Sequence, residues 1–555
     1  MTKNTRDWVR SGAPWIWLIA GSVSISLFMV LGVLSLTALR GLGYFWPADI
    51  ATIQYNDPTT NTKVTLIGEI QDREQVTRGR LESAGINLPG SVLEADRYLI
   101  KVGNRDTFGA DFRWIVEPFI ESQSYPADVV VIERREWGNY YGYLRAVKER
   151  GVVVAEGENA WESFESQVRS IQALTDKIAD IEKSRMSTIN YQIERLRLDE
   201  NRLRLSGEFD GAREAEMSEQ RVKLQATFAT LEKELSDLYA QINVNSYVIE
   251  IMDGRQIELP LGKVVRALRP NSMNVFEKLI TYIKNLVLFL TEDPREANTE
   301  GGIFPAIFGT VLMVLLMSLL VTPLGVVAAV YLREYAKQGA LTQLIRIAVN
   351  NLAGVPSIVY GLFGLGFFVY MLGGSIDRLF YPEALPAPTF GTGGILWASL
   401  TLAILTLPVV IVATEEGLSR IPRAIREGSL ALGATKAETL WRTVIPMASP
   451  AILTGSILAV ARAAGEVAPL MLVGVVKLAP TLPLDTNPPF LHLDRKFMHL
   501  GFHIYDVGFQ SPNVEAARPL VYATAFLLVI VVLVLNLAAI QIRNRLRERY
   551  RDLES

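Results

Sequence analysis

Cysteine is absent from the whole chain of 555 residues. This absence excludes disulfides, thiolate metal ligands and thiol nucleophiles. Histidine occurs only three times, and the phosphate-binding pattern GxxxxGK[ST] does not occur, so the chain has no P-loop of its own. The formal net charge of −3 gives no reason to expect a nucleic-acid partner. These shortages leave few groups for covalent catalysis, and an enzyme is therefore disfavoured.

Long apolar runs are abundant in the chain. Half of its residues are hydrophobic, and its mean hydropathy is +0.23. A membrane span needs about 20 consecutive, mostly apolar residues, and six runs qualify. These runs are residues 14–39, 303–332, 347–372, 395–414, 452–476 and 519–542. The first is too long for a signal peptide and lacks a clear small-residue cleavage site, so we expect an uncleaved anchor.

Basic residues near the spans predict the orientation, because Lys and Arg accumulate in short cytoplasmic flanks. Those near the two chain ends are Lys3, Arg6, Arg10, Arg543, Arg545, Arg547, Arg549 and Arg551. Those in the loops after the second and fourth spans are Arg333, Lys337, Arg346, Arg420, Arg423, Arg426, Lys436 and Arg442. We therefore expect a multi-pass protein of the bacterial inner membrane, with both termini and both of these loops in the cytoplasm.

Residues 41–301, between the first and second spans, are predicted to form a translocated, periplasmic domain. The segments "KVTLIGEI", "RYLIKVG" and "ADVVVIERR" have the β-rich composition and the bordering turn residues of strands. The later segment "YVIEIMDGRQIELPL" predicts a β-hairpin that turns at Asp253 and Gly254. The sequence therefore predicts a β module in this domain.

A coiled-coil helical hairpin is predicted inside the module at about residues 158–243, where Pro and Gly are almost confined to "SGEFDGA". Apolar residues alternate at spacings of four and three after that break, as in a heptad seam. They are Leu224, Phe228, Leu231, Leu235, Leu238 and Ile242. The seam before the break slips once and consists of Ile171, Leu174, Ile178, Ile181, Ile189, Ile193 and Leu196. A heptad pattern indicates how helices pack but not what they do. The hairpin is therefore either a docking or sensing arm or a solvated spacer.

The loop between the fourth and fifth spans is punctuated by Glu427, Gly433 and Pro446. A helix is expected before Gly433, which suits a C-terminal cap. After a turn, Thr435 or Lys436 is expected to begin a second, short amphipathic helix that lies across the membrane surface. Such a helix is suited to insertion into a groove on a partner protein.

The same loop resembles the EAA loop of ABC importer permeases, which docks on the ATPase subunit. In that pattern Gly follows Glu after six residues and Pro follows that Gly after thirteen, as Glu427, Gly433 and Pro446 do. The departures are mild, because Thr443 and Ile445 stand where Ile and Leu are usual. The resemblance implies a docking loop at 415–450. Its expected docking residues are Glu427, Gly433, Ala434, Thr435, Lys436 and Pro446.

The segments "NNLAGVPSIVYGLFGLGFF" and "LAVARAAGEVAPLMLVG" resemble the PstA-type permease of the bacterial phosphate importer. The resemblance covers roughly residues 301–541, and the insertion resembles the extra amino-terminal domain of a long subclass. It implies a six-span ABC permease fold that carries inorganic phosphate. The implied partners are two ATPase subunits, a sister PstC-type permease and a periplasmic phosphate-binding protein. ATP and Mg²⁺ then belong to the ATPase subunits, and this chain binds no cofactor.

The expected division of the chain follows from the spans and from this resemblance. Residues 1–40 form a cytoplasmic tail and the first anchor. The periplasmic domain comes next, and residues 302–542 form the permease domain with five spans. Residues 543–555 form a basic cytoplasmic tail.

Two charges, Arg462 and Glu466, lie inside the fifth predicted span. A spacing of four places both on one helix face, where they can pair. Each charge costs about 2.5–3.5 kcal/mol near the bilayer centre, so such residues are commonly functional. A guanidinium suits a planar oxyanion because it donates in a fork and stays protonated. Arg462 is therefore a candidate pathway residue. Glu466 either holds Arg462 in place or competes with the anion for it. A salt bridge that only orders the span is the alternative.

Pro356, Gly361, Gly364 and Gly366 interrupt the third predicted span. They suit either unwound backbone that lines the pathway or close helix packing. Close packing is the commoner cause.

The three histidines, His492, His499 and His503, precede the last span. The i, i+4 spacing of His499 and His503, with Asp494 nearby, is that of a metal pair. No metal-binding motif surrounds them, so we expect no metal here and favour contact with the binding protein, since this loop faces outward.

Two other functions remain compatible with these patterns. The docking loop does not distinguish phosphate from another oxyanion such as sulfate or molybdate. An envelope scaffold could also present a long coiled coil outside the membrane, but flanking anchors would suffice for it. Six spans and a docking loop therefore favour the permease.

Overall fold

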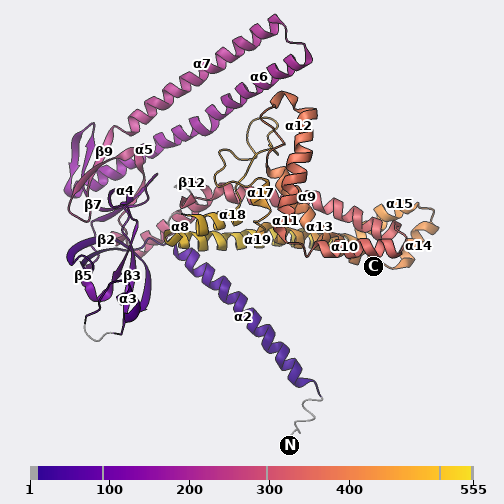
Figure 1. The fold of residues 1–555 in the computed structure, drawn as a ribbon, viewed down its shortest axis with the longest axis horizontal. Coiled ribbons are helices and arrows are strands. Elements are labelled where there is room, and N and C mark those ends of the chain that lie inside the picture. Colours follow the sequence, from indigo (N-terminus) through magenta and orange to yellow (C-terminus); the bar gives the residue numbers. More distant parts are fainter. Residues whose placement is uncertain (1–10, 90–92, 296–297, 512–513, 552–555) are drawn as a thin grey trace, which may run out of the picture.

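The computed structural model of the chain describes residues 11–89, 93–295, 298–511 and 514–551. Six helices in these residues are long and apolar enough to cross a membrane, which confirms the predicted number. They are Pro14–Gly43, Phe304–Tyr335, Ser357–Phe380, Ile395–Arg420, Lys436–Gly465 and Ala517–Arg545. Figure 1 shows a β module at one end of the helix bundle and the 415–450 loop at the other. We call these ends the module side and the docking side. Lys3, Arg6 and Arg10 lie outside the described residues.

The third span begins later than the sequence predicts. Helix α10 (Ala340–Leu352) is separate from the span, and the chain turns at Pro356 before α11 (Ser357–Phe363). The prediction of 347–372 was wrong here because the apolar residues of α10 continue the hydrophobic run. A residue that precedes proline disfavours helical backbone, which explains the break. The span then continues through the π-helical segment η8 (Gly364–Gly373) and α12 (Gly374–Phe380).

The fifth span is shifted towards the docking loop relative to the predicted range of 452–476. It comprises α15 (Lys436–Thr439), the π-helical segment η10 (Leu440–Val444) and α16 (Ile445–Gly465) in one continuous helix. The predicted separate helix on the membrane surface is therefore wrong, because it is the first part of the span. The helix ends at Gly465, and Pro469 follows before the short α17 (Leu470–Val473).

Helices α9 (Phe304–Val330), α13 (Ile395–Arg420) and α16 form the centre of the bundle. The remaining elements of this part are α8 (Val275–Thr291), β12 (Pro294–Arg295), β13 (Glu300–Gly301), η7 (Tyr331–Tyr335), η9 (Pro382–Ala384), α14 (Arg423–Ala431), α18 (Leu500–Tyr505), η11 (Asp506–Gln510) and α19 (Val514–Arg551). The first anchor, α2 (Ala13–Gly43), leaves the bundle at a wide angle (Figure 1) and touches α19 near its end, where an added Cβ on Gly41 would lie 2.8 Å from a backbone atom of Tyr522.

Close packing explains two of the three glycines of the third span. A Cβ on Gly361 would lie 2.6 Å from the Cα of Pro469, and one on Gly364 would lie 2.3 Å from the Thr401 hydroxyl oxygen. Gly366 differs, because a Cβ there would meet nothing within 4 Å. Small residues let helix backbones approach in membranes. This finding favours the packing interpretation for Gly361 and Gly364.

The β module consists of two antiparallel sheets, with strand orders β4-β3-β2-β1-β5 and β10-β9-β7-β6-β11 and with β8 beside β7. The strands are β1 (Ile50–Asp57), β2 (Thr62–Thr77), β3 (Glu94–Lys101), β4 (Phe112–Val116), β5 (Ile120–Ser124), β6 (Val129–Arg134), β7 (Tyr140–Glu149), β8 (Val152–Glu156), β9 (Asn245–Glu250), β10 (Gln256–Pro260) and β11 (Val264–Leu268). Short helical elements join them: α3 (Arg78–Ser83), α4 (Arg105–Phe108), η1 (Glu117–Phe119), η2 (Gly157–Asn159), η4 (Leu261–Lys263) and η5 (Pro270–Ser272). The predicted hairpin at Gly254 is confirmed, since β9 pairs with β10.

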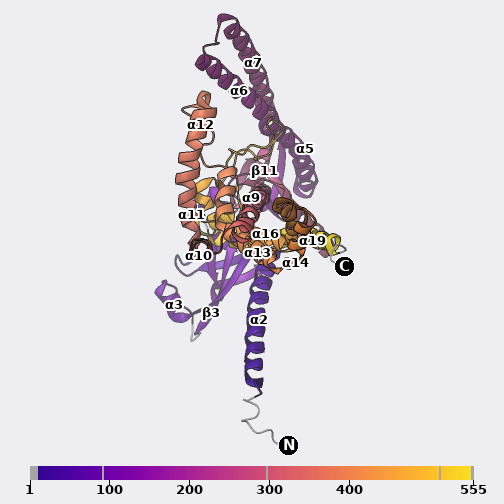
Figure 2. The same cartoon turned by 90° about the vertical axis from the view of Figure 1, so that its right-hand side faces the viewer.

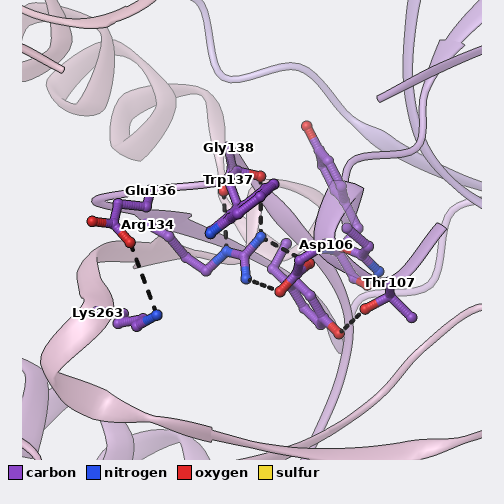
Figure 3. A network of polar contacts seen from close by, with 10 residues as sticks. Asp106, Thr107, Arg134, Glu136, Trp137, Gly138 and Lys263 are labelled. Atoms are coloured by element: carbon purple, nitrogen blue, oxygen red, sulfur yellow. Dashed lines mark hydrogen bonds and ion pairs between the residues drawn. The ribbon is translucent and has the colours of Figure 1, made fainter. Parts of the chain in front are cut away.

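A buried arginine ties the two sheets together. Arg134, at the end of β6, is 2% exposed and donates to both carboxylate oxygens of Asp106 in α4, at 2.8 and 3.2 Å. It also donates to the backbone oxygens of Trp137 and Gly138 (Figure 3). A buried guanidinium is stable only when its donors are satisfied, and here the partners lie in α4, which joins β3 to β4, and in the turn between β6 and β7.

The predicted helical hairpin is present and inserted between β8 and β9. One arm is α5 (Ala160–Asp180), η3 (Ile181–Met186) and α6 (Ser187–Ser206), and the other is α7 (Gly211–Ile242). The π-helical turn η3 accounts for the slip in the seam, because it inserts an extra residue into the helical repeat. Leu231 packs with Ile181 and Ile189 across the two arms. Six spans together with a β module and this hairpin confirm the predicted fold class.

The three histidines are buried inside the chain, so their predicted contact with a binding protein is wrong. His499 is 0% and His503 2% exposed, while the His492 Nε2 donates to the Asp485 carboxylate at 3.0 Å. No group of three or more metal-ligating side chains occurs among the described residues. Burial lowers the pKa of His499 to about 3 and that of His503 to about 4. The loop faces the module side, but its histidines face inward.

We predict that Gly364→Val destabilises the chain by about 1–3 kcal/mol, because the added side chain overlaps Thr401. The measurement is the midpoint of fluorescence-detected thermal unfolding of the purified chain. Gly366→Val is the matched control, since space is open at that position. Equal midpoints for the two variants would contradict the packing explanation.

We also predict that stability falls as the pH drops below 6.5. The unfolded chain binds protons at His499 and His503 below this pH, whereas the folded chain excludes them until about pH 3 to 4. At pH 5 this linkage costs about 2 kcal/mol per histidine. His503→Leu removes one such group and should flatten the decline of the melting temperature between pH 7 and pH 5. An unchanged slope in this variant would refute the prediction.

Candidate functional site

Arg462 and Glu466 lie at the end of the fifth span. Arg462 occupies the last turn of α16, while Glu466 is the first residue beyond the helix and has extended backbone. The guanidinium Nε lies 3.7 Å from a Glu466 carboxylate oxygen, so the two residues form an ion pair without a hydrogen bond. The spacing therefore predicts the pair, although the two residues do not share a helix as expected.

The ion pair is partly open. The side chain of Arg462 is 35% exposed and that of Glu466 is 20% exposed. Arg462 makes no hydrogen bond to any other residue in the described part of the chain, so its donors stay available to a ligand. The segment after Glu466 packs on α11, where Gly361 meets Pro469. The third and fifth spans together therefore place the pair.

The docking loop has the local geometry that the sequence predicts. Helix α14 ends before Gly433, whose φ of +90° is in the left-handed region that favours glycine. Thr435 begins the next helix in a capping box: its hydroxyl accepts from the Glu438 N–H at 3.2 Å, and the Glu438 carboxylate accepts from the Thr435 N–H at 2.9 Å. Ala434 lies between these caps and donates to the Ser429 carbonyl at 3.3 Å.

Two contacts fix the docking loop on the end of the second span. Arg426 pairs with Glu334 at 2.8 Å. Lys436 donates to the backbone oxygen of Glu334 and lies 4.5 Å from the centre of the Tyr335 ring. Both partners lie in η7, at the docking-side end of the span that contains α9. The loop is therefore attached to the bundle and not free to swing.

The docking loop carries an exposed apolar surface, as the predicted amphipathic helix implies for Trp441, whereas Leu430 and Leu432 escaped the sequence analysis. Leu432 is 91% exposed, Trp441 is 72% exposed and Leu430 is 47% exposed. Glu427 is also exposed and forms no ion pair with a described residue. Apolar anchors beside a charge are typical of a protein interface. Leu432 directly precedes Gly433, the helix cap that the sequence predicts. This position at the end of α14 was the available signal that Leu432 is exposed.

A continuous helix joins the two sites. The fifth span begins at Lys436 in the docking loop and ends beside Arg462, about 40 Å away at 1.5 Å per residue. Pro446 lies in the first turn of α16, directly after the π-helical segment η10, where the Ile445 N–H donates to the Leu440 carbonyl. The π-helical turn shifts the backbone hydrogen bonds by one residue just before Pro446, which has no N–H to donate, and the helix continues through it.

One cavity of the described part of the chain lies away from this ion pair. It has a volume of about 620 Å³ and lies between the β module and the module-side ends of α2 and α19. Its Glu133 carboxylate pairs with Arg266 and, at 2.5 Å, with Arg295. These charges compensate one another, and neither Arg462 nor Glu466 lines the cavity. We therefore assign the cavity to the junction between the β module and the helix bundle.

The permease part of the chain is similar to known transport proteins. Residues 321–552 match the family described as binding-protein-dependent transport system inner membrane component. The probable ABC transporter permease protein YqgI of Bacillus subtilis is 33% identical over 258 residues, which are 45% of this chain and 81% of that protein. The phosphate transport system permease protein PstA 1 of Mycobacterium tuberculosis is 36% identical over 44% of this chain and 71% of its own length.

One further relative agrees with this match. The phosphate transport system permease protein PstA of Yersinia pestis is 32% identical over 46% of this chain and 77% of its own length. Among solved structures, a chain of the inward-facing MetNI methionine ABC transporter is 18% identical, with a TM-score of 0.33 over 43% of this chain and 94% of that chain. The chain belongs to the inner-membrane permease family of binding-protein-dependent ABC transporters.

Proposed function

We propose that this chain is the PstA-type permease of an ATP-driven importer for inorganic phosphate. Its family membership makes it a multi-pass inner-membrane permease that is not itself catalytic and binds no cofactor. The observation that carries the phosphate proposal is Arg462, which makes no hydrogen bond with the described residues at the end of the fifth span. The similarity to PstA proteins of Mycobacterium tuberculosis and Yersinia pestis supports the same cargo.

The chemistry of the pair suits a passing anion. A guanidinium keeps its charge and offers a planar fork to two oxyanion oxygens. Glu466 lies 3.7 Å from Arg462, which is near enough to lower the cost of the buried charge and too far to occupy the donors. An anion that enters beside Arg462 meets the repulsion of Glu466, so its stay is short. Weak binding of this kind favours release over trapping.

The proposed driving force reaches this pair from the docking loop. The ATPase subunits would seat the exposed Leu432 and Trp441 and pair with Glu427. Gly433, Ala434, Thr435 and Lys436 shape the loop, and any displacement of it moves the continuous helix that ends beside Arg462. We propose two ATPase subunits, a PstC-type sister permease and a periplasmic phosphate-binding protein as partners.

The proposed orientation places the docking side in the cytoplasm, with both termini, and the module side in the periplasm. The basic docking loop supports this arrangement, since Arg423, Arg426, Lys436 and Arg442 all belong to it. The β module and its hairpin would then be the periplasmic domain, at about residues 41–301.

We predict that Arg462→Gln abolishes phosphate uptake while the complex still assembles. The variant keeps a polar side chain but removes the charge and the fork. The measurement is labelled phosphate uptake in cells that lack other phosphate importers, with co-purification of the ATPase as the test of assembly. Arg378→Gln is the matched control, because Arg378 is an exposed arginine at the end of the third span that bonds only to its own helix. Normal uptake by Arg462→Gln would refute the assigned role.

Cargo identity is tested by competition in the reconstituted complex. Unlabelled phosphate should suppress the uptake of labelled phosphate, and sulfate or molybdate at the same concentration should not. Transport of sulfate or molybdate with no transport of phosphate would replace the proposed cargo by the other oxyanion. Binding of the ATPase subunits to membranes that contain the chain distinguishes either permease from an envelope scaffold.

We predict that Gly433→Ala weakens ATPase docking, because a φ of +90° strains any residue with a Cβ. No neighbour lies within 4 Å of the added atom, so the effect is on the backbone alone. Gly428→Ala is the control: it also meets nothing within 4 Å, and it lies in helix α14, where alanine is favourable. Co-purified ATPase should fall for Gly433→Ala only. Equal yields for both variants would contradict the assigned geometry.

A further inference from the structure

The helical hairpin does more than extend from the β module, because its α6 arm touches the permease at two points. Figure 2 shows α6 and α7 on one side of the bundle and α2 on the opposite side. In both views the end of α6 lies beside α12. The two points of contact are η9, between the third and fourth spans, and the loop 477–498 before the last span.

The first contact buries a charge. Glu383 in η9 is 4% exposed, and its carboxylate accepts from Arg202 of α6 at 2.6 Å. The adjacent Asn201 donates to the Glu383 carbonyl at 2.9 Å. A buried carboxylate without its partner is costly, and Arg202 is the only ion-pair partner of Glu383 in the described residues. The permease therefore presents a buried carboxylate whose ion-pair partner, among the described residues, belongs to the hairpin.

The second contact lies eleven residues earlier on α6, about 16 Å away along the helix. The Tyr191 hydroxyl donates to the Pro488 carbonyl, and its ring meets that of His492 edge to face at 6.2 Å. The loop under it is stiff, because Asp485 accepts from Arg495 at 2.6 Å and also pairs with His492. Because the two contacts are separated along α6, they fix the direction of the arm relative to the permease as well as its distance from the permease.

Backbone hydrogen bonds connect this loop with the pathway. Ile395 at the start of the fourth span donates to the Arg495 carbonyl at 2.9 Å. Phe497 accepts from the Val476 N–H at 3.0 Å and donates to the Gly474 carbonyl at 3.3 Å. Gly474 follows Glu466 by only eight residues, just beyond α17. The hairpin, the loop and the segment after the Arg462–Glu466 pair are therefore in unbroken contact.

We propose that the hairpin is a brace that holds the module-side mouth of the permease closed, and that α6 must part from Glu383 and Pro488 for the pathway to open on that side. The inference rests on the proposed transport function, but not on which anion is carried. It differs from both hypotheses raised by the sequence, since neither a free docking arm nor a plain spacer needs an ion pair with a carboxylate that is buried in the permease. The seam between α6 and α7 keeps the arm rigid, so that it moves as one body.

The absence of native cysteine makes a direct test possible. In the double variant Arg202→Cys/Glu383→Cys, a short, reducible bifunctional thiol reagent joins α6 to η9. Uptake of labelled phosphate by the complete complex in liposomes is measured before cross-linking, after it, and after reduction. We expect a loss of at least tenfold on cross-linking, corrected for the unlinked fraction, and recovery on reduction. A smaller loss would overturn the brace, and so would failure of the two thiols to cross-link.

Matched controls separate the brace from other effects. Glu200→Cys/Arg221→Cys replaces an ion pair between α6 and α7, so its cross-link staples the hairpin internally and should leave uptake unchanged. The single-cysteine variants report any effect of the reagent on partner subunits. Tyr191→Cys/Pro488→Cys tests the second contact if the first double variant is inactive before cross-linking. Absence of phosphate uptake in the parent complex contradicts the cargo instead, and the same comparison is then made with the anion that is carried.

Discussion

The continuous helix Lys436–Gly465 is the constraint on which the rest of the structure depends. In a membrane the backbone must satisfy its hydrogen bonds internally, so a helix that crosses it behaves as a rod. This rod begins in the loop with the capping box of Thr435 and ends beside Arg462. No loop separates the two ends, so under the proposed function a push at the docking side would be delivered to the charged pair. The shape of the loop and the position of the arginine are therefore parts of one element.

Close packing around this rod keeps its movement directed. Gly455 of α16 faces Ala413 of α13 so closely that an added Cβ would lie 2.7 Å from the alanine side chain. Gly361 lets the third span touch the segment after Glu466. Helices in lipid gain little from hydrophobic burial and associate through such contacts of small residues. The bundle therefore transmits displacement through backbone contact and not through long, flexible side chains.

The β module and the hairpin are stabilised differently from the bundle. Their sheets and heptad seam bury apolar side chains as a water-soluble domain does. Their contacts with the permease are mostly polar and few, with the buried Glu383 as the most demanding. The proposed brace is therefore a body with its own core that is joined to the bundle through the contacts at Glu383 and Pro488.

Local patterns were sufficient to predict a large part of this protein. Six apolar runs predict six spans, and the heptads with "SGEFDGA" predict the hairpin and its break. Even the slip in the seam has its counterpart in the π-helical turn η3. The caps at Gly433 and Thr435 were also predictable, because a turn of helix is decided by residues within four positions. The pairing of Arg462 with Glu466 follows from the same short range.

Tertiary structure alone decided which helix continues and which side chain is buried. The sequence places the three histidines in a loop that faces the module side, yet the loop folds back and encloses His499 and His503. The fifth span absorbs the docking helix because packing on the bundle extends it through Pro446, which composition suggests is a break. The partner of Glu383 lies 181 residues away in α6. Contacts between residues so distant in the chain depend on the whole packed arrangement, and no local spacing encodes them.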